Sequence, residues 1–268
     1  IQLESKKYHN LVKEYLDNGV NYPTALSNAL VDLTGKKINQ PNDILGITYI
    51  REILKLKSKI KPLTIKRNNN YNCTELEDFF SSATSIRYAL KNNSDVSKQV
   101  PKYTLRFLTH KLHFIDDYFK FLKYHILINP HLEDIQTVDE GIDHRIYKYI
   151  IESKSLEELI LKIKTKRYTY NKLNRMFTHI LCNFTKEEAS SFDHIEYIRI
   201  LGFNNQGRLF LKNIKNDINV PIITNFSSIH SKMLDIEFRS TCCYASILEE
   251  NERVKMIESE YKNYPIQG

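Results

Sequence analysis

Two small groups of polar residues in the first hundred residues have the side-chain types that bind phosphate. Asn42 lies at the expected start of one helix, and Ser82 and Thr84 lie at the expected start of another. Free backbone N–H groups and a positive partial charge make a helix N-terminus attractive to anions. Arg87, one turn further along, can reach a phosphate held there. Plain helix capping alone explains the same small polar residues, and without further context it is the favoured interpretation, which Arg87 shifts only slightly towards phosphate binding.

Arg67 is a further candidate for ligand binding. The residues before it, Pro62 to Lys66, have the pattern of a short strand with Leu63 and Ile65 on one face. In an open α/β sheet, the loops that follow the strands carry the ligand-binding groups. Arg67 therefore lies where ligand-binding groups are usually found.

The stretch from Leu159 to Thr185 contains six Lys or Arg residues and no acidic residue, and Tyr168 and Tyr170 lie among them. Cations that neutralise phosphates, next to rings that stack on unpaired bases, favour binding of a structured RNA. A basic helical hairpin with its tyrosines in the core is the alternative. The RNA-binding residues predicted here are Lys162, Lys164, Lys166, Arg167, Tyr168, Lys172 and Arg175.

The elements that must position these residues are mostly helical. Helical spacing of apolar residues predicts helices over residues 4–16, 117–128, 140–151, 155–164 and 169–181. Asn42 is expected to cap the helix that follows it, and Gly35 to end the one before. Nearly everything from Pro101 to Gly202 reads as helix, with Gly202 as a C-cap, and residues 220–224 read as a short strand.

Composition narrows the class of protein. The 268 residues carry a net charge of +7 and contain only 7 Gly and 7 Pro, which disfavours a loop-rich all-β fold and favours an anionic partner. The four cysteines form no C-x-x-C pair, which indicates reduced thiols and a cytoplasmic protein without a zinc site. No apolar run is long enough to span a membrane, so we expect no membrane contact.

A polar stretch from Asn92 to Pro101 is the expected domain boundary. It divides the chain into a front domain of residues 1–95 and a helix-rich, basic domain of residues 96–268.

Six motifs resemble the bacterial tRNA(Met) cytidine acetate ligase family, in order along essentially the whole chain. The Lys-Thr-Lys-Arg-Tyr-Thr-Tyr motif is the most specific, whereas Ser-Ala-Thr-Ser-Ile-Arg is shared more widely among nucleotidyltransferases. The matching stretches are residues 41–46, 64–67, 82–87, 140–145, 164–170 and 200–204.

This resemblance implies a mainly α chain: the C-terminal part of a Rossmann-like α/β nucleotidyltransferase domain, followed by a helical domain. It implies a ligase that uses ATP, with magnesium, and acetate to form acetyl-adenylate. The acetyl group then passes to N4 of the wobble cytidine of elongator tRNA(Met). The ATP-contacting residues implied in this way are Asn42, Arg67, Ser82, Thr84 and Arg87. The segment from Lys162 to Arg175 would face the tRNA.

The family's His-x-Gly-His motif does not occur in these residues. We therefore expect the chain to lack the N-terminal half of the ATP site, to contain no catalytic residue and to be inactive by itself. Two other functions stay open. One is a non-catalytic RNA-binding module, and the other is a nucleotidyltransferase that acts on a small metabolite.

Overall fold

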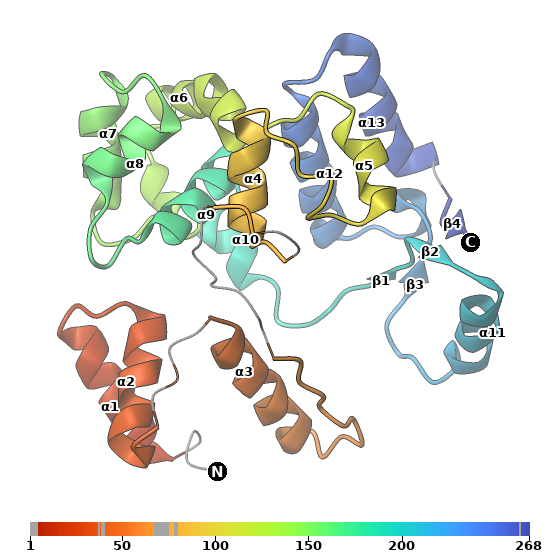
Figure 1. The fold of residues 1–268 in the computed structure, drawn as a ribbon, viewed down its shortest axis with the longest axis horizontal. Helices are drawn as coiled ribbons and strands as arrows, with labels where there is room; N and C mark the ends of the chain where they lie inside the picture. The colour runs from red at the N-terminus through yellow and green to blue at the C-terminus, as the bar shows by residue number, and fades with distance from the viewer. Residues whose placement is uncertain (1–4, 37, 39–40, 67–74, 78–79, 263) are drawn as a thin grey trace. The chain divides into compact units, whose positions relative to one another are not determined.

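The computed structural model describes residues 5–36, 38, 41–66, 75–77, 80–262 and 264–268. The chain divides into two compact units, Ile1–His113 and Phe114–Gly268. Helices make up most of the regular structure in each unit, which confirms the mainly α class (Figure 1). These units are defined by contacts within the fold. The boundary expected after residue 95 divides the chain by function, and it stays a prediction.

The first unit opens with a helical hairpin, α1 (Lys6–Asp17) and α2 (Tyr22–Thr34). The side chains of Ser5 and Asn21 cap the two helices by accepting backbone N–H groups of the first turns. Gly35 ends α2 with a φ of 70°, as the sequence predicted, because glycine adopts this left-handed conformation without steric cost. The buried residues of the hairpin are Tyr8, Val12, Ala25 and Ala29.

The described residues of this unit continue with α3 (Pro41–Lys55), α4 (Ala83–Lys91) and α5 (Lys102–Leu108). The prediction that Asn42 caps α3 is wrong, because the helix already begins at Pro41. The proline ring presets the helical φ and the missing N–H costs nothing at a first helical position, so the helix starts one residue earlier.

The predicted strand from Pro62 to Lys66 is also wrong. These residues are irregular and exposed, and the described part of this unit contains no strand. Leu63 and Ile65 are 93% and 98% exposed. A strand is stable only when another strand takes up its backbone hydrogen bonds, and the described residues offer none to this segment.

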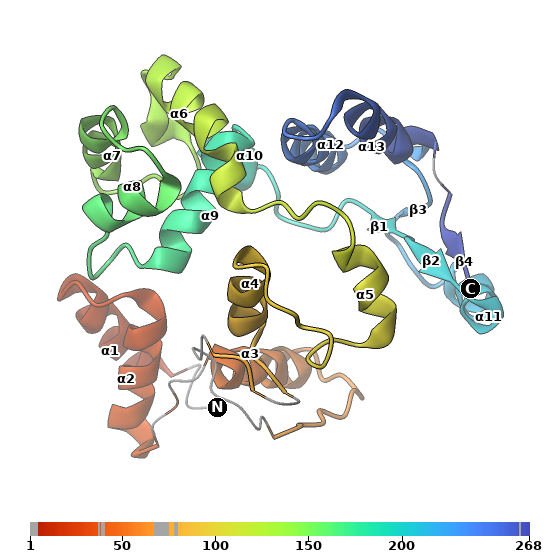
Figure 2. The same ribbon diagram turned by 45° about the horizontal axis from the view of Figure 1, so that its top comes forward.

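The second unit begins with helices packed around one apolar core (Figure 2). The interior is formed by residues spaced three and four apart, as the sequence predicted for residues 169–181. The elements are η2 (Ile115–Tyr118), α6 (Phe119–Ile128), η3 (Leu132–Asp134), α7 (Ile142–Ile150), α8 (Leu156–Ile163), α9 (Tyr170–Leu181) and α10 (Lys186–Ser190). The largest fully buried side chains include Phe177, Leu122, Ile126, Ile146, Leu159 and Leu173.

The described residues of the rest of this unit form two small parallel strand pairs, three α-helices and one short 3-10 helix. Strand β1 pairs with β3, and β2 pairs with β4. The elements are β1 (Ile198–Arg199), β2 (Gly202–Phe203), α11 (Asn205–Ile214), β3 (Ile222–Ile223), η4 (Phe226–Ser228), α12 (Lys232–Ala245), α13 (Glu250–Lys262) and β4 (Ile266–Gln267). The predicted strand over 220–224 is thus confirmed as β3.

Gly202 is part of strand β2 and does not cap a helix, so that prediction is wrong. The helical region ends at Ser190, and the chain runs extended or irregular from there to β2. A Cβ atom on Gly202 would lie 3.0 Å from the carbonyl oxygen of Ile266, so glycine is needed for close approach to β4.

Arg199 connects β1 to the two last helices. Its guanidinium donates to Glu237 of α12 and to Glu260 of α13, each at 2.7 Å. It also lies over the Phe226 ring, 4.5 Å from the ring centre. None of the helices in the described ranges combines the length and the apolar character needed to cross a bilayer.

Candidate nucleic-acid interface

The basic segment, residues 162–175, joins the end of α8 to the first turns of α9. Thr169 caps α9 and accepts the backbone N–H of Lys172 at 3.4 Å. In the loop between the helices, the backbone N–H of Tyr168 donates to Thr165 Oγ1 at 3.0 Å, and the N–H of Thr165 donates to the Tyr168 carbonyl oxygen at 3.2 Å. The loop is therefore a defined turn that sets the directions of its side chains.

Tyr168 belongs to the core. Its side chain is 4% exposed, and its hydroxyl donates to the backbone oxygen of Asp139 at 2.5 Å. Lys172 Nζ lies 3.9 Å from the centre of the ring, and burial raises the pKa of Tyr168 to about 12. A buried ring cannot stack on a nucleotide base, so the expectation that Tyr168 contacts RNA directly is corrected. Tyr170, in contrast, is 45% exposed.

Two of the six cations in the segment have carboxylate partners. Lys162 Nζ lies 3.0 Å from Glu152 and 2.8 Å from Glu158, and Arg167 lies 2.9 Å from Glu140. Glu158, then Glu152, hold the pKa of Lys162 above its usual range. All three carboxylates lie outside the stretch from Leu159 to Thr185. Glu158 precedes Lys162 by four residues on the same helix, a spacing that is visible in the sequence, whereas Glu152 and Glu140 are further away along the chain.

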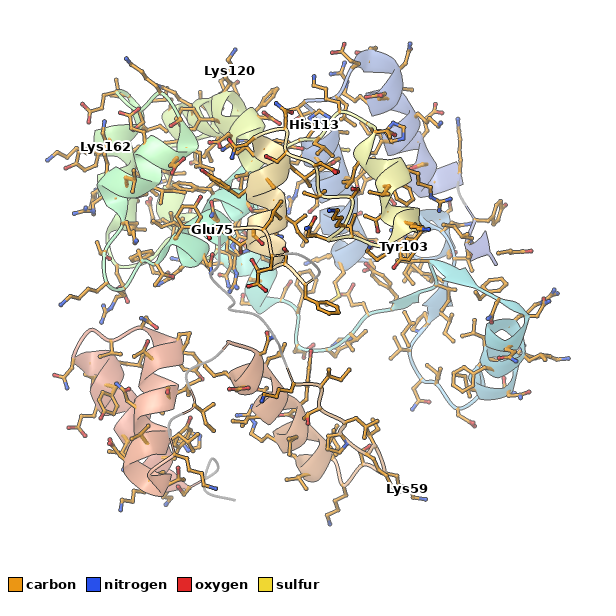
Figure 3. The ribbon with its side chains drawn as sticks, viewed as in Figure 1. Lys59, Glu75, Tyr103, His113, Lys120 and Lys162 are labelled. Atoms are coloured by element: carbon orange, nitrogen blue, oxygen red, sulfur yellow. The ribbon has the colours of Figure 1, made fainter. Side chains whose placement is uncertain are left out.

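The other four cations of the segment have no carboxylate partner among the described residues. We call them the open cations: Lys164, Lys166, Lys172 and Arg175. Lys172 is half-buried and the rest are exposed. Unneutralised cations next to the exposed Tyr170 ring can bind a phosphate backbone and stack on a base. Figure 3 labels Lys162 on α8, from which the segment starts.

The loop of residues 136–140, which supplies the hydrogen-bond partner of Tyr168, is held in place by contacts from α9 and α10. The sequence analysis did not predict these contacts. His179 Nδ1 lies 2.9 Å from the backbone oxygen of Gln136, and Lys186 Nζ donates to that of Val138 at 2.8 Å. Thr137 has a φ of 72°, a strained value for a β-branched residue. No pattern in the sequence points to these long-range contacts. They fix the loop that supplies the partners of Tyr168 and Arg167.

We expect Lys162→Gln to lower tRNA affinity less than twofold, because Glu152 and Glu158 already neutralise this charge. Lys166→Gln, which removes an open cation, is expected to cost about fivefold or more. Filter binding at about 0.1 M salt compares the two variants. Equal losses would contradict the division of the segment into paired and open cations.

The candidate nucleotide-binding residues of the first unit lie on two helices. Ser82 is 3% exposed and caps α4, accepting the backbone N–H of Ser85 at 3.0 Å. Thr84 and Arg87 are exposed on the first turns of α4, and Asn42 is exposed on the first turn of α3. No hydrogen bond joins Asn42 to the described residues of α4.

Arg67, the remaining candidate, lies outside the described residues. The described ranges contain no group of three or more His, Cys, Asp or Glu side chains placed to hold a metal ion. The ATP-contacting roles of all five residues therefore stay predictions.

A family model and curated relatives place this chain in the same family. The HIGH Nucleotidyl Transferase family model matches residues 1–260. The tRNA(Met) cytidine acetate ligase of Anoxybacillus flavithermus is 37% identical, over 97% of this chain and 70% of that protein. The protein of the same name from Clostridium novyi is also 37% identical, over 98% of this chain and 69% of its own length.

Two solved structures have the same fold. The apo crystal structure of Thermotoga maritima TmcAL gives a TM-score of 0.84 at 25% identity, over 98% of this chain and 71% of that one. The same protein bound with alpha-thio ATP gives 0.83 at 26% identity, over 98% and 70%. The match includes the first residues of this chain, and the comparisons do not support the expectation of a missing ATP-binding half.

Proposed function

The chain belongs to the HIGH nucleotidyl transferases and to the family of the tRNA(Met) cytidine acetate ligases, and on this premise we propose that it serves N4-acetylation of the wobble cytidine in elongator tRNA(Met). In this function the second unit holds the tRNA through its open cations. The first unit contributes to binding ATP.

The reaction has two steps. A carboxylate oxygen of acetate attacks the α-phosphorus of ATP, an O–P bond forms, and pyrophosphate leaves with the electrons of the broken P–O bond. The cytidine N4 amine then attacks the acetyl carbonyl carbon, AMP leaves, and the amine loses a proton. Positioning and stabilisation of phosphate charge are what a protein adds to such transfers. Magnesium would share that charge.

One observation carries the tRNA-holding role, namely the four open cations grouped at the α8–α9 turn beside Tyr170. A solvated surface usually mixes both signs of charge, whereas this turn has no acid in its own sequence and leaves these four cations without a carboxylate partner among the described residues. Local excess positive charge of this kind binds nucleic acid by releasing counterions from phosphates. The name of the relatives adds that the nucleic acid is tRNA(Met).

The ATP-binding role is assigned to the first turn of α4 together with Asn42 and Arg67. Because the Ser82 side chain caps this helix, the neighbouring Thr84 hydroxyl and Arg87 guanidinium are the exposed groups at its positive end. Both can donate to phosphate oxygens. Ser82 then acts by shaping the turn, since its hydroxyl is buried.

Deleting the gene for this protein is expected to remove N4-acetylcytidine from elongator tRNA(Met) purified from the cells, as measured by mass spectrometry of nucleosides. The intact gene should restore the modification, and a gene carrying Arg87→Ala should restore about a tenth of it or less. Lys91→Ala removes the same charge from the other end of α4 and is the matched control.

Full modification in the deletion strain would refute the proposed function. Full restoration by Arg87→Ala would refute only the role of Arg87. A deletion strain that keeps the modification while the purified chain still binds tRNA would favour the non-catalytic RNA-binding alternative.

A further inference from the structure

Two cysteines of the second unit, Cys182 and Cys243, lie in direct contact although they are far apart in the sequence. Cys182 follows the last residue of α9, and Cys243 belongs to α12. Both are free thiols, and a hydrogen bond joins their two side chains. Cys182 is 9% exposed, whereas Cys243 is half-buried and packs against the helical core. Two thiols that touch across two helices meet the first requirement for a disulfide, which is that the cysteines lie close together.

The fold holds these two thiols together through contacts that do not involve them. On α12, one turn before Cys243, Arg239 Nη2 donates to both carboxylate oxygens of Glu188 in α10, at 2.8 and 2.9 Å. Just after Cys243, the backbone oxygen of Tyr244 accepts the hydroxyl of Tyr118 at 2.9 Å. Helix α12 is therefore fixed to the helical core on both sides of Cys243, and a bond between the two sulfur atoms requires little movement of the backbone.

Cys182 is the thiol of the pair that ionises more easily. The hydrogen bond from Cys243 holds the pKa of Cys182 below its usual range, although burial opposes this effect. Ser240 and the Arg239 charge lower the same pKa further. The Nε of Arg239 is buried and has no hydrogen-bond partner among the described residues, so this cation keeps a donor that Glu188 does not use. Because the thiolate is the nucleophile, Cys182 is expected to react first.

We propose that Cys182 and Cys243 form a site of reversible oxidation, at which a small hydroperoxide converts the two thiols into a disulfide between α9 and α12. The pair suits a reagent as small as hydrogen peroxide, because the attacking sulfur of Cys182 is almost buried. The bond ties the end of α9 to α12, and the first turns of α9 carry part of the basic segment. This inference does not depend on the acetylation reaction.

The oxidation takes place in two steps. The Cys182 thiolate attacks one oxygen of hydrogen peroxide, an S–O bond forms and the O–O bond breaks. The other oxygen leaves as hydroxide and takes up the proton that the Cys182 thiol released, and Cys182 becomes a sulfenic acid. The sulfur of Cys243 then attacks the Cys182 sulfur, an S–S bond forms and the S–O bond breaks, and water leaves with the Cys243 proton. Two thiols thus lose two electrons, and the peroxide is reduced to two molecules of water.

Peptide mapping of the 268-residue chain tests the proposal. The reduced chain is treated with hydrogen peroxide at about 0.1 to 1 mM, its remaining thiols are alkylated, and it is digested with trypsin. Trypsin places Cys182 in the peptide of residues 176–186, and Cys242 and Cys243 in that of residues 240–253. Mass spectrometry is expected to find these two peptides linked within one chain, and dithiothreitol should release them. No link, a link between two chains, or a link of Cys182 to Cys73 instead would overturn the proposal.

Cys242 provides a matched control, because it is the neighbour of Cys243 on α12 and is half-buried as well. Cys242→Ser should form as much of the linked peptide as the unchanged chain does. Cys243→Ser should form less than about a tenth as much, because no resolving thiol is left beside Cys182. Equal linkage in the two variants would show that Cys243 is not the partner, and the proposal would be wrong.

The order of the two steps has its own test. In the Cys243→Ser chain, dimedone should trap the sulfenic acid on Cys182. In the Cys182→Ser chain, dimedone labelling of Cys243 should be at least about tenfold slower, because Cys243 keeps its proton. Circular dichroism shows that each variant keeps its helices. Faster labelling of Cys243 than of Cys182 would contradict the assignment of Cys182 as the attacking thiol.

Discussion

Replacing the open cations Lys164, Lys166, Lys172 and Arg175 together by glutamine is expected to weaken tRNA binding by up to about 10³-fold at 0.1 M salt. Each cation that neutralises a phosphate lowers the slope of log affinity against log salt by about 0.7 to 0.9. Removing four such contacts is therefore expected to make the slope of the quadruple variant shallower by about 3. Filter binding of elongator tRNA(Met) between about 0.05 and 0.3 M salt measures both the affinity and the slope.

The matched control removes four charges from elsewhere in the second unit. Lys120, Lys154, Lys215 and Lys255 are exposed and lie outside the basic segment. Their joint replacement by glutamine changes the net charge equally, and we expect it to lower tRNA affinity less than about tenfold. Equal effects of the two quadruple variants would show that tRNA responds to the overall charge, and the α8–α9 interface would then be wrong.

Tyr168→Ala is expected to destabilise the helical core of the second unit by about 3 to 5 kcal/mol, the usual range for truncating a buried aromatic side chain. The ring is buried beneath Lys172, and its hydroxyl bond to the Asp139 backbone oxygen connects the basic segment to the preceding loop. Hydrogen exchange of peptides from α8 and α9 measures the change locally, without assuming that the two units unfold together. Tyr168→Phe keeps the ring and should cost only about 1 kcal/mol.

Tyr170→Ala is expected to have the opposite pattern to the Tyr168 variants, with an effect on tRNA affinity and almost none on the stability of the core. Its side chain is 45% exposed, so exchange in α8 and α9 should stay almost unchanged. Loss of one stacked base should lower tRNA affinity about 5-fold to 100-fold. If Tyr168→Phe weakened tRNA binding while Tyr170→Ala did not, the assignment of the two tyrosines would have to be reversed.

Local sequence patterns predicted the parts of this protein that depend on neighbouring residues. The cap at Ser82, the end of α2 at Gly35, and the bounds and buried stripe of α9 all follow from residue types at helical spacing. The same patterns failed where a distant partner decides the structure. Pro62 to Lys66 has the composition of a strand but no partner strand among the described residues, and Gly202 serves a close approach to Ile266.

The basic segment from Lys162 to Arg175, its helical setting and the family resemblance were therefore determined by the sequence alone, because charge and helix periodicity are local properties. Only the tertiary structure decided which of its charges are available. It placed Glu152 beside Lys162 and Glu140 beside Arg167, and it buried Tyr168 while leaving Tyr170 exposed. The physical reason is that ion pairing and burial depend on which residues meet in space, and residues far apart in the sequence supply most of those partners.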